Sequence, residues 1–306
     1  MGRKTKRGGG RILSGLLLVD KPRGVTSFGV VSQVRRALGV RRVGHTGTLD
    51  PMATGLLPIC LGQATKLARF VTDADKTYRG RALLGVATDT LDAEGEVTRV
   101  DPPEAVAAVD AERFSAAMTA FRGPITQRPP AYSAIKVDGE RLYAKARRGE
   151  AVEAPERRVT IHGLELVAAA PPEFEFDVRC SKGTYIRTLA ADIGERLGLA
   201  AHLVGLRRTA VGDHQVSDAI TLDAFLEDPE SAVASRLVPL PLVASQLPAV
   251  TADAALAAHF RNGRKRPVPN GGVGPARLLA EDGALIAIID LKGDAPAEII
   301  RGFPAE

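Results

Sequence analysis

The chain has 306 residues, of which 45% are hydrophobic and 25% charged, a composition typical of a globular protein that buries its own core. No uncharged apolar stretch is long enough to cross a membrane, and the basic start leads into no apolar signal-peptide core, so we expect neither a membrane protein nor a secreted one. The two cysteines, Cys60 and Cys180, lie in unrelated contexts and cannot form a disulfide framework or a cysteine-rich zinc site, which favours a cytoplasmic location.

The net charge of +5 is carried by the first residues of the chain. Residues 1–11 hold five basic side chains and no acid, so residues 12–306 are formally neutral. We expect residues 1–11 to form a disordered basic tail, because these charges and a run of glycines cannot pack. Arginine pairs recur along the chain while acids gather in residues 89–112. Such segregated charge favours a polyanionic partner, although solvated surface arginines produce the same pattern.

The first predicted elements are a strand and a helix. Residues 16–19 form a short apolar run that predicts a buried strand, and residues 20–24 predict the turn that ends it. Ser27 is the expected cap of a helix that ends at Gly39. The apolar face of this helix holds Val31, Val34 and Leu38.

The middle of the chain predicts further strands and two helices. Residues 78–86 are strand-like and residues 110–121 are helical. Strands at 159–167 and 173–180 follow, and the alternation in the second one points Cys180 into the core. A helix then buries a stripe of apolar side chains, which are Ile186, Leu189, Ile193 and Leu197.

Three segments define the expected domain organisation. Residues 123–158 are rich in proline and basic side chains and predict a long exposed insertion, a kind of segment that often carries function. Residues 229–250 are rich in proline, alanine and serine and predict a linker. Residues 251–306 predict a small, mostly β module. Its expected elements are a helix at 251–260 and strands at 277–280, 284–290 and 297–302.

Residues 44–62 hold the densest set of candidate functional groups. Four glycines, two prolines, His45 and Asp50 are interleaved with apolar residues, which indicates a loop held against the core. Asp50 precedes Pro51, so its backbone is biased to an extended conformation. On these residues alone Asp50 is a candidate carboxylate of a site, but an Asp-Pro pair that caps a helix is the more common explanation.

This segment closely resembles the catalytic motif of the TruB family of tRNA pseudouridine synthases. Further segments match that family in the same order along the chain, at residues 18–27, 76–78, 85–92, 127–136, 183–190 and 206–209. The resemblance implies that the protein isomerises the T-loop uridine of tRNA (position 55) to pseudouridine. In that reaction the C1′–N1 bond is cleaved and the base is rejoined to C1′ through C5.

The resemblance also implies a fold and a division into domains. The expected fold is mixed α/β (α+β), a pseudouridine synthase fold with a largely antiparallel central sheet. Residues 12–245 would form the catalytic domain, with the RNA-binding insertion at about 123–158. Residues 251–306 would form a PUA-like C-terminal domain that binds RNA.

By the same resemblance Asp50 is the carboxylate that acts at the ribose, either by attack on C1′ or by removal of a ribose proton. Arg187 would form an ion pair with Asp50 and keep it ionised. The ring of Tyr78 would stack on the uracil, and its hydroxyl could assist removal of the C5 proton. For each of these residues a purely structural role remains the alternative.

The resemblance assigns the remaining site residues to substrate binding. The target uridine is stacked inside a folded loop, so it must be flipped out. His45 would occupy the space that the flipped bases leave, and Tyr185 and Leu206 would line the uracil pocket. Lys21 would support the active-site loop, for which a charge pair is one means, and plain surface solvation is the alternative. The residues expected to contact RNA are Arg128, Lys136, Arg141, Arg147 and Arg148.

The expected reaction needs no cofactor and no metal, and the sequence contains no nucleotide-binding or metal-binding motif. We expect a monomer that binds the T-arm of tRNA without a protein partner. Two alternatives stay open. The chain could bind or fold tRNA without catalysis, or it could be the catalytic subunit of an RNA-guided synthase.

Overall fold

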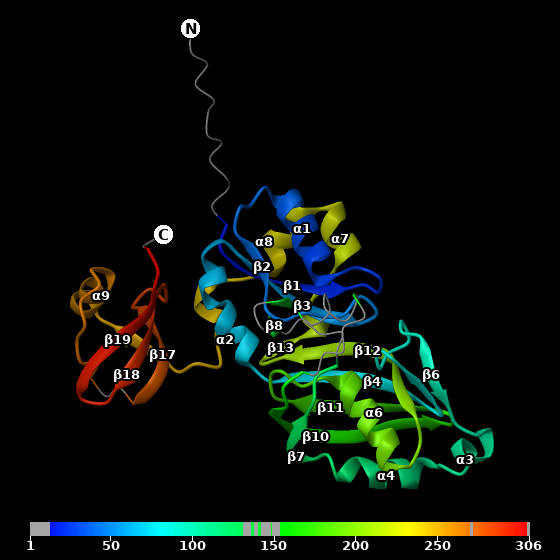
Figure 1. Ribbon diagram of the computed structural model, residues 1–306. Coiled ribbons are helices and arrows are strands. Elements are labelled where there is room, and N and C mark those ends of the chain that lie inside the picture. The colour runs from blue at the N-terminus through cyan, green and yellow to red at the C-terminus, as the bar shows by residue number, and fades with distance from the viewer. Residues whose placement is uncertain are drawn as a thin grey trace.

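The computed structural model describes residues 13–130, 136–137, 140–141, 148, 154–269 and 272–304. Most of these residues form a large mixed sheet with helices packed on it, and a smaller four-stranded sheet lies beside it (Figure 1). The expected tail at 1–11 and much of the expected insertion lie outside the described residues. In the described part of the chain, no helix is both long and apolar enough to cross a membrane.

The first half of the chain contributes the N-terminal helices and the central strands. In chain order these elements are β1 (Gly15–Lys21), α1 (Ser27–Leu38), β2 (Val43–His45), β3 (Thr54–Leu61), the 3-10 helix η1 (Gly62–Leu67), α2 (Ala68–Asp73), β4 (Lys76–Leu84), β5 (Val86–Thr88), β6 (Val97–Val100), α3 (Pro103–Ala107), α4 (Ala111–Thr119) and β7 (Gly123–Gln127).

The second half completes the central sheet and adds the smaller one. Its elements are β8 (Lys136–Val137), β9 (Glu140–Arg141), β10 (Arg157–Ala170), β11 (Glu173–Cys180), α6 (Ile186–Arg196), β12 (Ala201–Val211), β13 (His214–Gln215), η2 (Val216–Asp218), β14 (Ile220–Thr221), α7 (Leu222–Glu227), α8 (Pro229–Arg236), β15 (Leu237–Val238), η3 (Leu240–Leu242), β16 (Ala249–Ala252), α9 (Ala254–Arg261), β17 (Val273–Ala280), β18 (Leu285–Lys292) and β19 (Ala295–Gly302).

The central sheet runs in the order β14-β1-β3-β12-β4-β11-β10-β7, with β2, β13 and β15 attached beside this path. The pairs β1–β14 and β3–β12 are parallel and the other pairs are antiparallel. The smaller sheet runs β16-β17-β18-β19, and only its first pair is parallel. This is the mixed, largely antiparallel α/β fold expected from the sequence, with a mostly β module at the C-terminal side.

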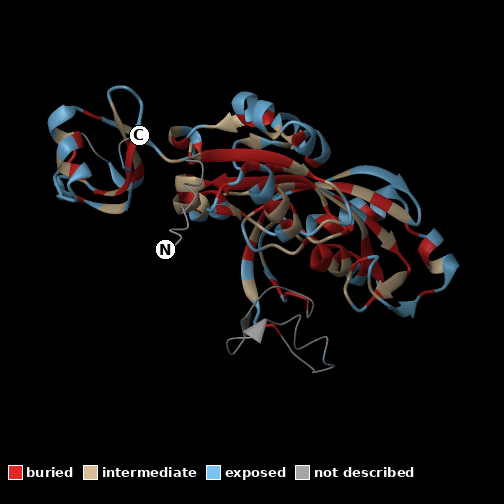
Figure 2. Ribbon diagram, turned by 90° about the horizontal axis from the view of Figure 1, so that it is seen from above, coloured by how far each residue is buried: buried red, intermediate tan, exposed pale blue. Residues whose placement is uncertain are grey.

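Strand β1 lies between two hydrophobic cores because its side chains alternate between the two faces of the sheet. Leu17 and Val19 belong to a core shared with α1, α4, α6, α7 and α8. Leu16 and Leu18 belong to a second core that contains side chains of α2 and of the C-terminal module. Figure 2 shows the resulting continuous band of buried residues along the central strands.

Strand β11 follows the predicted alternation and packs its inner face on helices. Phe174, Phe176, Val178 and Cys180 are all buried. The ring of Phe174 stacks on that of Phe114 from α4, with centroids 4.2 Å apart. The helix predicted at 110–121 is confirmed as α4, and the buried stripe of α6 is confirmed from Ile186 to Ile193.

Four local predictions are wrong. The N-cap of α1 is Thr26, whose side chain accepts from the amide of Gly29, while Ser27 lies inside the helix. No helix begins at Asp50, because a turn and then β3 follow it. The exposed segment is shorter than expected, since β7 pairs with β10 inside the central sheet. The expected linker at 229–250 is instead ordered structure, in which α8 packs on the first core and β15 pairs with β1.

Candidate active site

The loop that carries Asp50 is fixed at several points between β2 and β3. Its backbone is held by three hydrogen bonds, namely the Thr46 amide to the Pro58 carbonyl at 3.2 Å, the Ala53 amide to the Asp50 carbonyl at 3.1 Å and the Gly24 amide to the Pro51 carbonyl at 2.8 Å. The Ser27 hydroxyl donates to the Leu49 carbonyl and accepts from its amide. The first residues of α1 therefore hold the loop that carries Asp50, and the Ser27 hydroxyl is engaged there and does not cap the helix.

Lys21 supports the loop that carries Asp50 through hydrogen bonds. Its side chain is fully buried, and its ammonium donates to the backbone carbonyls of Pro22, Val25 and Pro51 at 2.9, 2.7 and 3.3 Å. The surface-solvation alternative is therefore wrong, and the loop is supported through carbonyls and not through an ion pair. Burial lowers the pKa of Lys21 to about 8, against an opposing effect of the Asp50 carboxylate.

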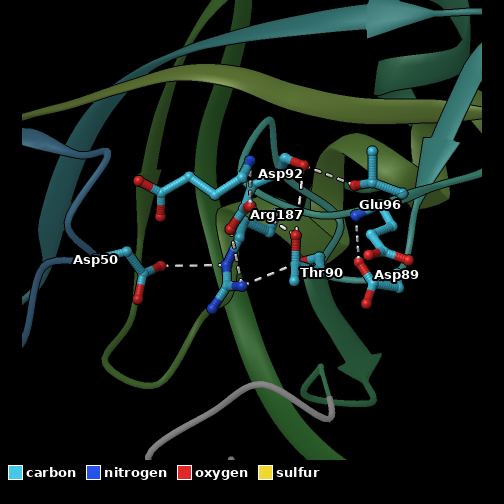
Figure 3. Close-up of polar contacts among 8 residues, drawn as sticks. Asp50, Asp89, Thr90, Asp92, Glu96 and Arg187 are labelled. Carbon is cyan, nitrogen blue, oxygen red and sulfur yellow. Dashed lines mark hydrogen bonds and ion pairs between the residues drawn. The ribbon is translucent and has the colours of Figure 1, made fainter. Parts of the chain in front are cut away.

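Arg187 joins two carboxylates at the start of α6. Its Nε lies 3.1 Å from Asp50 Oδ2, and its Nη1 lies 3.0 Å from Asp92 Oδ2 and donates to the Thr90 carbonyl at 2.9 Å (Figure 3). The side chains of Arg187 and Asp92 are both about 95% buried, whereas that of Asp50 is 37% exposed. The geometry predicted for Asp50 and Arg187 is thus present.

Asp92 is itself fixed by its turn. Its Oδ1 accepts from the Thr90 hydroxyl at 2.6 Å and from the Glu94 amide at 3.0 Å. Leu91, between Thr90 and Asp92, has a φ of 60°, which is uncommon for a residue other than glycine. Asp92 was not a candidate in the sequence, although its segment matched the family pattern, because acids on both sides of it made it resemble a solvated surface.

A cavity of about 260 Å³ lies above the Asp50–Arg187 pair. The predicted site residues Asp50, Tyr78, Tyr185, Arg187 and Leu206 line it. Further lining side chains include Thr72, Lys76, Lys182, Thr184 and Arg208. Five of the seven residues predicted for catalysis or substrate binding thus meet at one cavity from separate elements, while His45 and Lys21 do not line it.

Two strands and one loop position the pocket's aromatic side chains. Tyr78 lies in β4, is 9% exposed and faces Arg208 across the β4–β12 pair. The Tyr185 amide donates to Oε1 of the buried Gln127 at 3.0 Å, and Gln127 Nε2 donates back to the Tyr185 carbonyl at 3.2 Å. Gln127 thereby fixes the residue that precedes α6, and with it the start of the helix that carries Arg187.

The pKa values of Asp50 and Tyr78 in the pocket are shifted in the same direction. Burial raises the pKa of Asp50, and the Arg187 guanidinium opposes this effect. Burial also raises the pKa of Tyr78, with the Arg208 guanidinium acting in the opposite direction. Asp50 is therefore a carboxylate in a partly desolvated place with one cation against it, which is a suitable setting for a reactive carboxylate.

His45 lies in β2 next to the catalytic loop and is half-buried. Its Nδ1 accepts from the Gly47 amide at 3.3 Å, which fixes the orientation of the ring. Burial and the charge of Arg208 lower its pKa. The imidazole does not line the cavity, so its position beside the loop is compatible with the predicted contact to RNA and gives no sign of acid or base catalysis.

The residues predicted to contact RNA are described only in part. Arg128 is exposed and lies 3.1 Å from Glu156. Lys136 and Arg141 are paired in the short β8–β9 hairpin, and nothing is described of their side chains. Arg148 is exposed, and Arg147 lies outside the described residues.

Comparisons with known proteins agree with this site. Residues 35–186 match the N-terminal domain of TruB family pseudouridylate synthase, and residues 187–241 match the C-terminal domain of tRNA pseudouridylate synthase B. The tRNA pseudouridine synthase B of Azoarcus sp. (strain BH72) is 47% identical over 279 residues, which is 91% of each chain. That of Cupriavidus metallidurans is 44% identical over 303 residues, 95% of each chain.

The fold, the site and these relatives place the protein in the class of the pseudouridine synthases, which are isomerases. Within that class, the chain belongs to the TruB family of pseudouridylate synthases.

Solved structures share the fold at lower identity. A chain of an H/ACA RNP bound to a substrate RNA containing 2′-deoxyuridine has a TM-score of 0.74 at 23% identity, covering 95% of this chain and 85% of that chain. A chain of a Cbf5-Nop10-Gar1 complex has a TM-score of 0.72 at 24% identity, covering 95% and 84%. These likenesses establish the pseudouridine synthase fold, and the C-terminal sheet is consistent with a PUA-like module.

Proposed function

We propose that this enzyme converts the T-loop uridine of tRNA, at position 55, to pseudouridine. The observation that carries the proposal is the Asp50–Arg187 ion pair of 3.1 Å at a pocket lined by Tyr78 and Leu206. It is supported by relatives that are named tRNA pseudouridine synthase B and are aligned over most of the chain.

In the proposed reaction Asp50 acts at the ribose of the target uridine. The C1′–N1 bond breaks, the uracil turns within the pocket, and C5 joins C1′ before C5 loses its proton. Asp50 either attacks C1′ or removes a ribose proton, and both roles need an ionised carboxylate. Arg187 would keep Asp50 ionised and oriented, because a buried guanidinium favours the charged form of a carboxyl group.

The other site residues would hold the flipped nucleotide. Tyr78, which lines the pocket, would stack on the uracil, and its hydroxyl would assist removal of the C5 proton. Leu206 and Tyr185 would close the walls around the ring. His45 would occupy the space that the flipped base leaves in the T-loop, since it lies directly beside the catalytic loop.

Binding of the T-arm would involve surfaces around this pocket. We assign it to the segment that carries Arg128, Lys136, Arg141, Arg147 and Arg148, and to the PUA-like module at 251–306. The catalytic domain would span 12–245. Because the reaction consumes only a folded tRNA, we further propose that a cytoplasmic monomer acts without a protein partner.

The test is an assay with purified protein and an unmodified tRNA transcript that carries tritium at uridine C5. We expect release of one tritium per tRNA without any added protein, RNA or cofactor, and loss of release in Asp50→Asn. Product mapping then locates the modified uridine. Product formation by Asp50→Asn would refute the role of Asp50, and tight binding of tRNA without release would favour the binding-only alternative or the RNA-guided one.

A further inference from the structure

The largest fully buried side chain in the described part of the molecule is that of Arg208, which is 1% exposed. It lies in β12, between β3 and β4, and it lines the same cavity as Asp50 and Tyr78. An arginine side chain stays protonated in proteins, so this is a permanent positive charge below the reaction site. The proposed roles of the other site residues leave this charge without a function.

The contacts of Arg208 are all with neutral groups. Its Nε donates to the Leu56 carbonyl at 2.7 Å and its Nη2 to the Gly47 carbonyl at 3.2 Å. Within the described residues, no carboxylate lies within 4.0 Å of it. By contrast, two other cations of the cavity wall are paired with acids, Arg187 with Asp50 and Asp92, and Lys182 with Asp73 at 2.8 Å.

The Arg208 guanidinium also forms a side-chain hydrogen bond with Tyr78 in the wall of the pocket. Its Nη1 lies 3.4 Å from the place where a Cβ on Gly47 would stand, so a side chain at this position would pack against the guanidinium. Burial lowers the pKa of His45 and of Lys76, and the charge of Arg208 adds to this effect; at Tyr78 the same charge opposes the rise in pKa that burial causes. A buried cation without an acid partner has a large unfavourable desolvation energy unless an anion reaches it.

The proposed isomerisation generates such an anion. When the C1′–N1 bond breaks, its electron pair leaves with the uracil, and the negative charge is shared among N1 and the ring carbonyl oxygens. This holds whether Asp50 attacks C1′ or removes a ribose proton. When C5 then bonds to C1′, the ring becomes neutral again. The C5 proton then leaves and N1 gains a proton, which gives neutral pseudouridine, so the charge that follows cleavage lasts until C5 bonds to C1′.

We propose that Arg208 is a further catalytic residue, whose guanidinium stabilises the uracil anion through a carbonyl oxygen of the detached ring. This inference rests on the proposed function. A preorganised cation aimed at charge that develops only during the reaction is the arrangement that accelerates a chemical step without tightening substrate binding. Lys76, which also lines the cavity, likewise contacts only carbonyls among the described residues, but burial lowers its pKa to about 8, whereas the Arg208 guanidinium stays charged.

The test compares two substrates that differ in the stability of this anion. One tRNA carries uridine at the target position, and the other carries 5-fluorouridine there, whose fluorine withdraws electrons and stabilises the ring anion. Single-turnover rates are measured with saturating enzyme, as loss of the target nucleoside from nuclease digests. The variants are Arg208→Met, which removes the charge, and Arg208→Lys, which keeps it.

We expect Arg208→Met to slow conversion of the uridine substrate by about 100-fold, which is typical for loss of one preorganised donor. With 5-fluorouridine the loss should be smaller by about tenfold, because the anion needs the guanidinium less. Arg208→Lys should lie between the wild type and Arg208→Met, and the tRNA dissociation constant should stay within about twofold, as expected for a group that acts only in the reaction.

Arg277 offers a matched control. It too contacts only backbone carbonyls, at Leu247, Pro241 and Ser245, but it lies in the C-terminal module away from the pocket. Arg277→Met should lower the melting temperature and leave the ratio of the two substrate rates unchanged.

Equal losses on both substrates for Arg208→Met would overturn the inference, because they indicate a structural role. If Arg208→Met does not fold, the ratio of the rates on the two substrates is measured for Arg208→Lys, and equal losses on both substrates then overturn the inference. A wild-type enzyme that converts no uridine would refute the proposed function itself.

Discussion

Asp92 lies outside the cavity and is joined to Asp50 through Arg187. It binds Arg187 from the side opposite to Asp50, so the guanidinium is shared between two carboxylates. Asp92→Asn would keep the shape of the contact and remove the charge. Arg187 would then pair more strongly with Asp50 and draw it away from the ribose.

We predict that Asp92→Asn lowers the single-turnover rate by about 10- to 100-fold, the range seen when partners behind a reactive group are replaced. Binding of tRNA should not change, since Asp92 is buried behind Arg187. Rapid-quench kinetics and filter binding separate the two quantities. Asp89→Asn is the control, because among the described residues the Asp89 carboxylate accepts a hydrogen bond from the Glu96 amide and forms no ion pair with Arg187. An unchanged rate for Asp92→Asn would show that Arg187 is positioned without it.

Lys21 predicts a pH dependence of stability. Its pKa is lowered from 10.5 to about 8 by burial. Between these values the unfolded chain binds the proton and the folded chain does not, so the contribution of Lys21 to stability rises with pH across this interval. The free energy of unfolding of the wild type, measured in urea at several pH values, should therefore increase relative to that of Lys21→Met above about pH 8. A difference that is constant with pH would contradict the prediction.

At the scale of elements, the site depends on the close approach of β3 and β12. Gly55 has a φ of 99°, and a Cβ on it would lie 2.3 Å from the Arg208 carbonyl oxygen. Gly39, at the end of α1, also has a positive φ of 64°, but a Cβ there would meet nothing within 4 Å. The two glycines share the conformational restriction and differ only in the steric contact.

Gly39→Ala should therefore cost about 1–2 kcal/mol, the usual strain of a left-handed conformation. Gly55→Ala should cost about 1–3 kcal/mol more, because the strands must separate. Because Gly55 of β3 is paired with Arg208 of β12, Gly55→Ala should also reduce the single-turnover rate at a temperature where the variant is folded, whereas Gly39→Ala should not. Chemical denaturation and single-turnover assays measure both effects. Equal destabilisation by the two substitutions would mean that the strands tolerate the extra carbon.

The elements also explain which features the sequence could predict. Strands such as β11 and helices such as α6 are periodic in polarity, and their burial follows from that period. Asp50 was identifiable because its motif is contiguous. Asp92 and Arg208 were missed because their functional contacts are long-range, to side chains and carbonyls that only the fold brings near. The supposed linker at 229–250 failed for a related reason, since its few apolar side chains pack on a core built by distant strands.

At the scale of the whole molecule, the C-terminal module shares a core with the catalytic part. Leu285, Ile288 and Phe303 pack in the same cluster as Leu16 and Phe70. The Lys66 ammonium donates to the Gly302 carbonyl at 3.0 Å and lies 5.2 Å from the centre of the Phe303 ring. The module is thus joined to the second face of the central sheet by apolar side chains and by a direct polar contact.

This shared core predicts that the two parts unfold together. Phe303→Ala should destabilise the protein by about 3–5 kcal/mol, as for other buried phenylalanines, and thermal unfolding should remain a single transition at a lower temperature. Val273→Ala is the control, because Val273 lies in the same module but is 87% exposed, and it should change stability by less than about 0.5 kcal/mol. Calorimetry measures both. Two separate transitions in the wild type, or a loss confined to one of two transitions in Phe303→Ala, would show that the interface does not couple the module to the catalytic part. In that case tRNA would have to hold the two parts in place, whereas a coupled unfolding means that the free enzyme already presents both surfaces to its substrate.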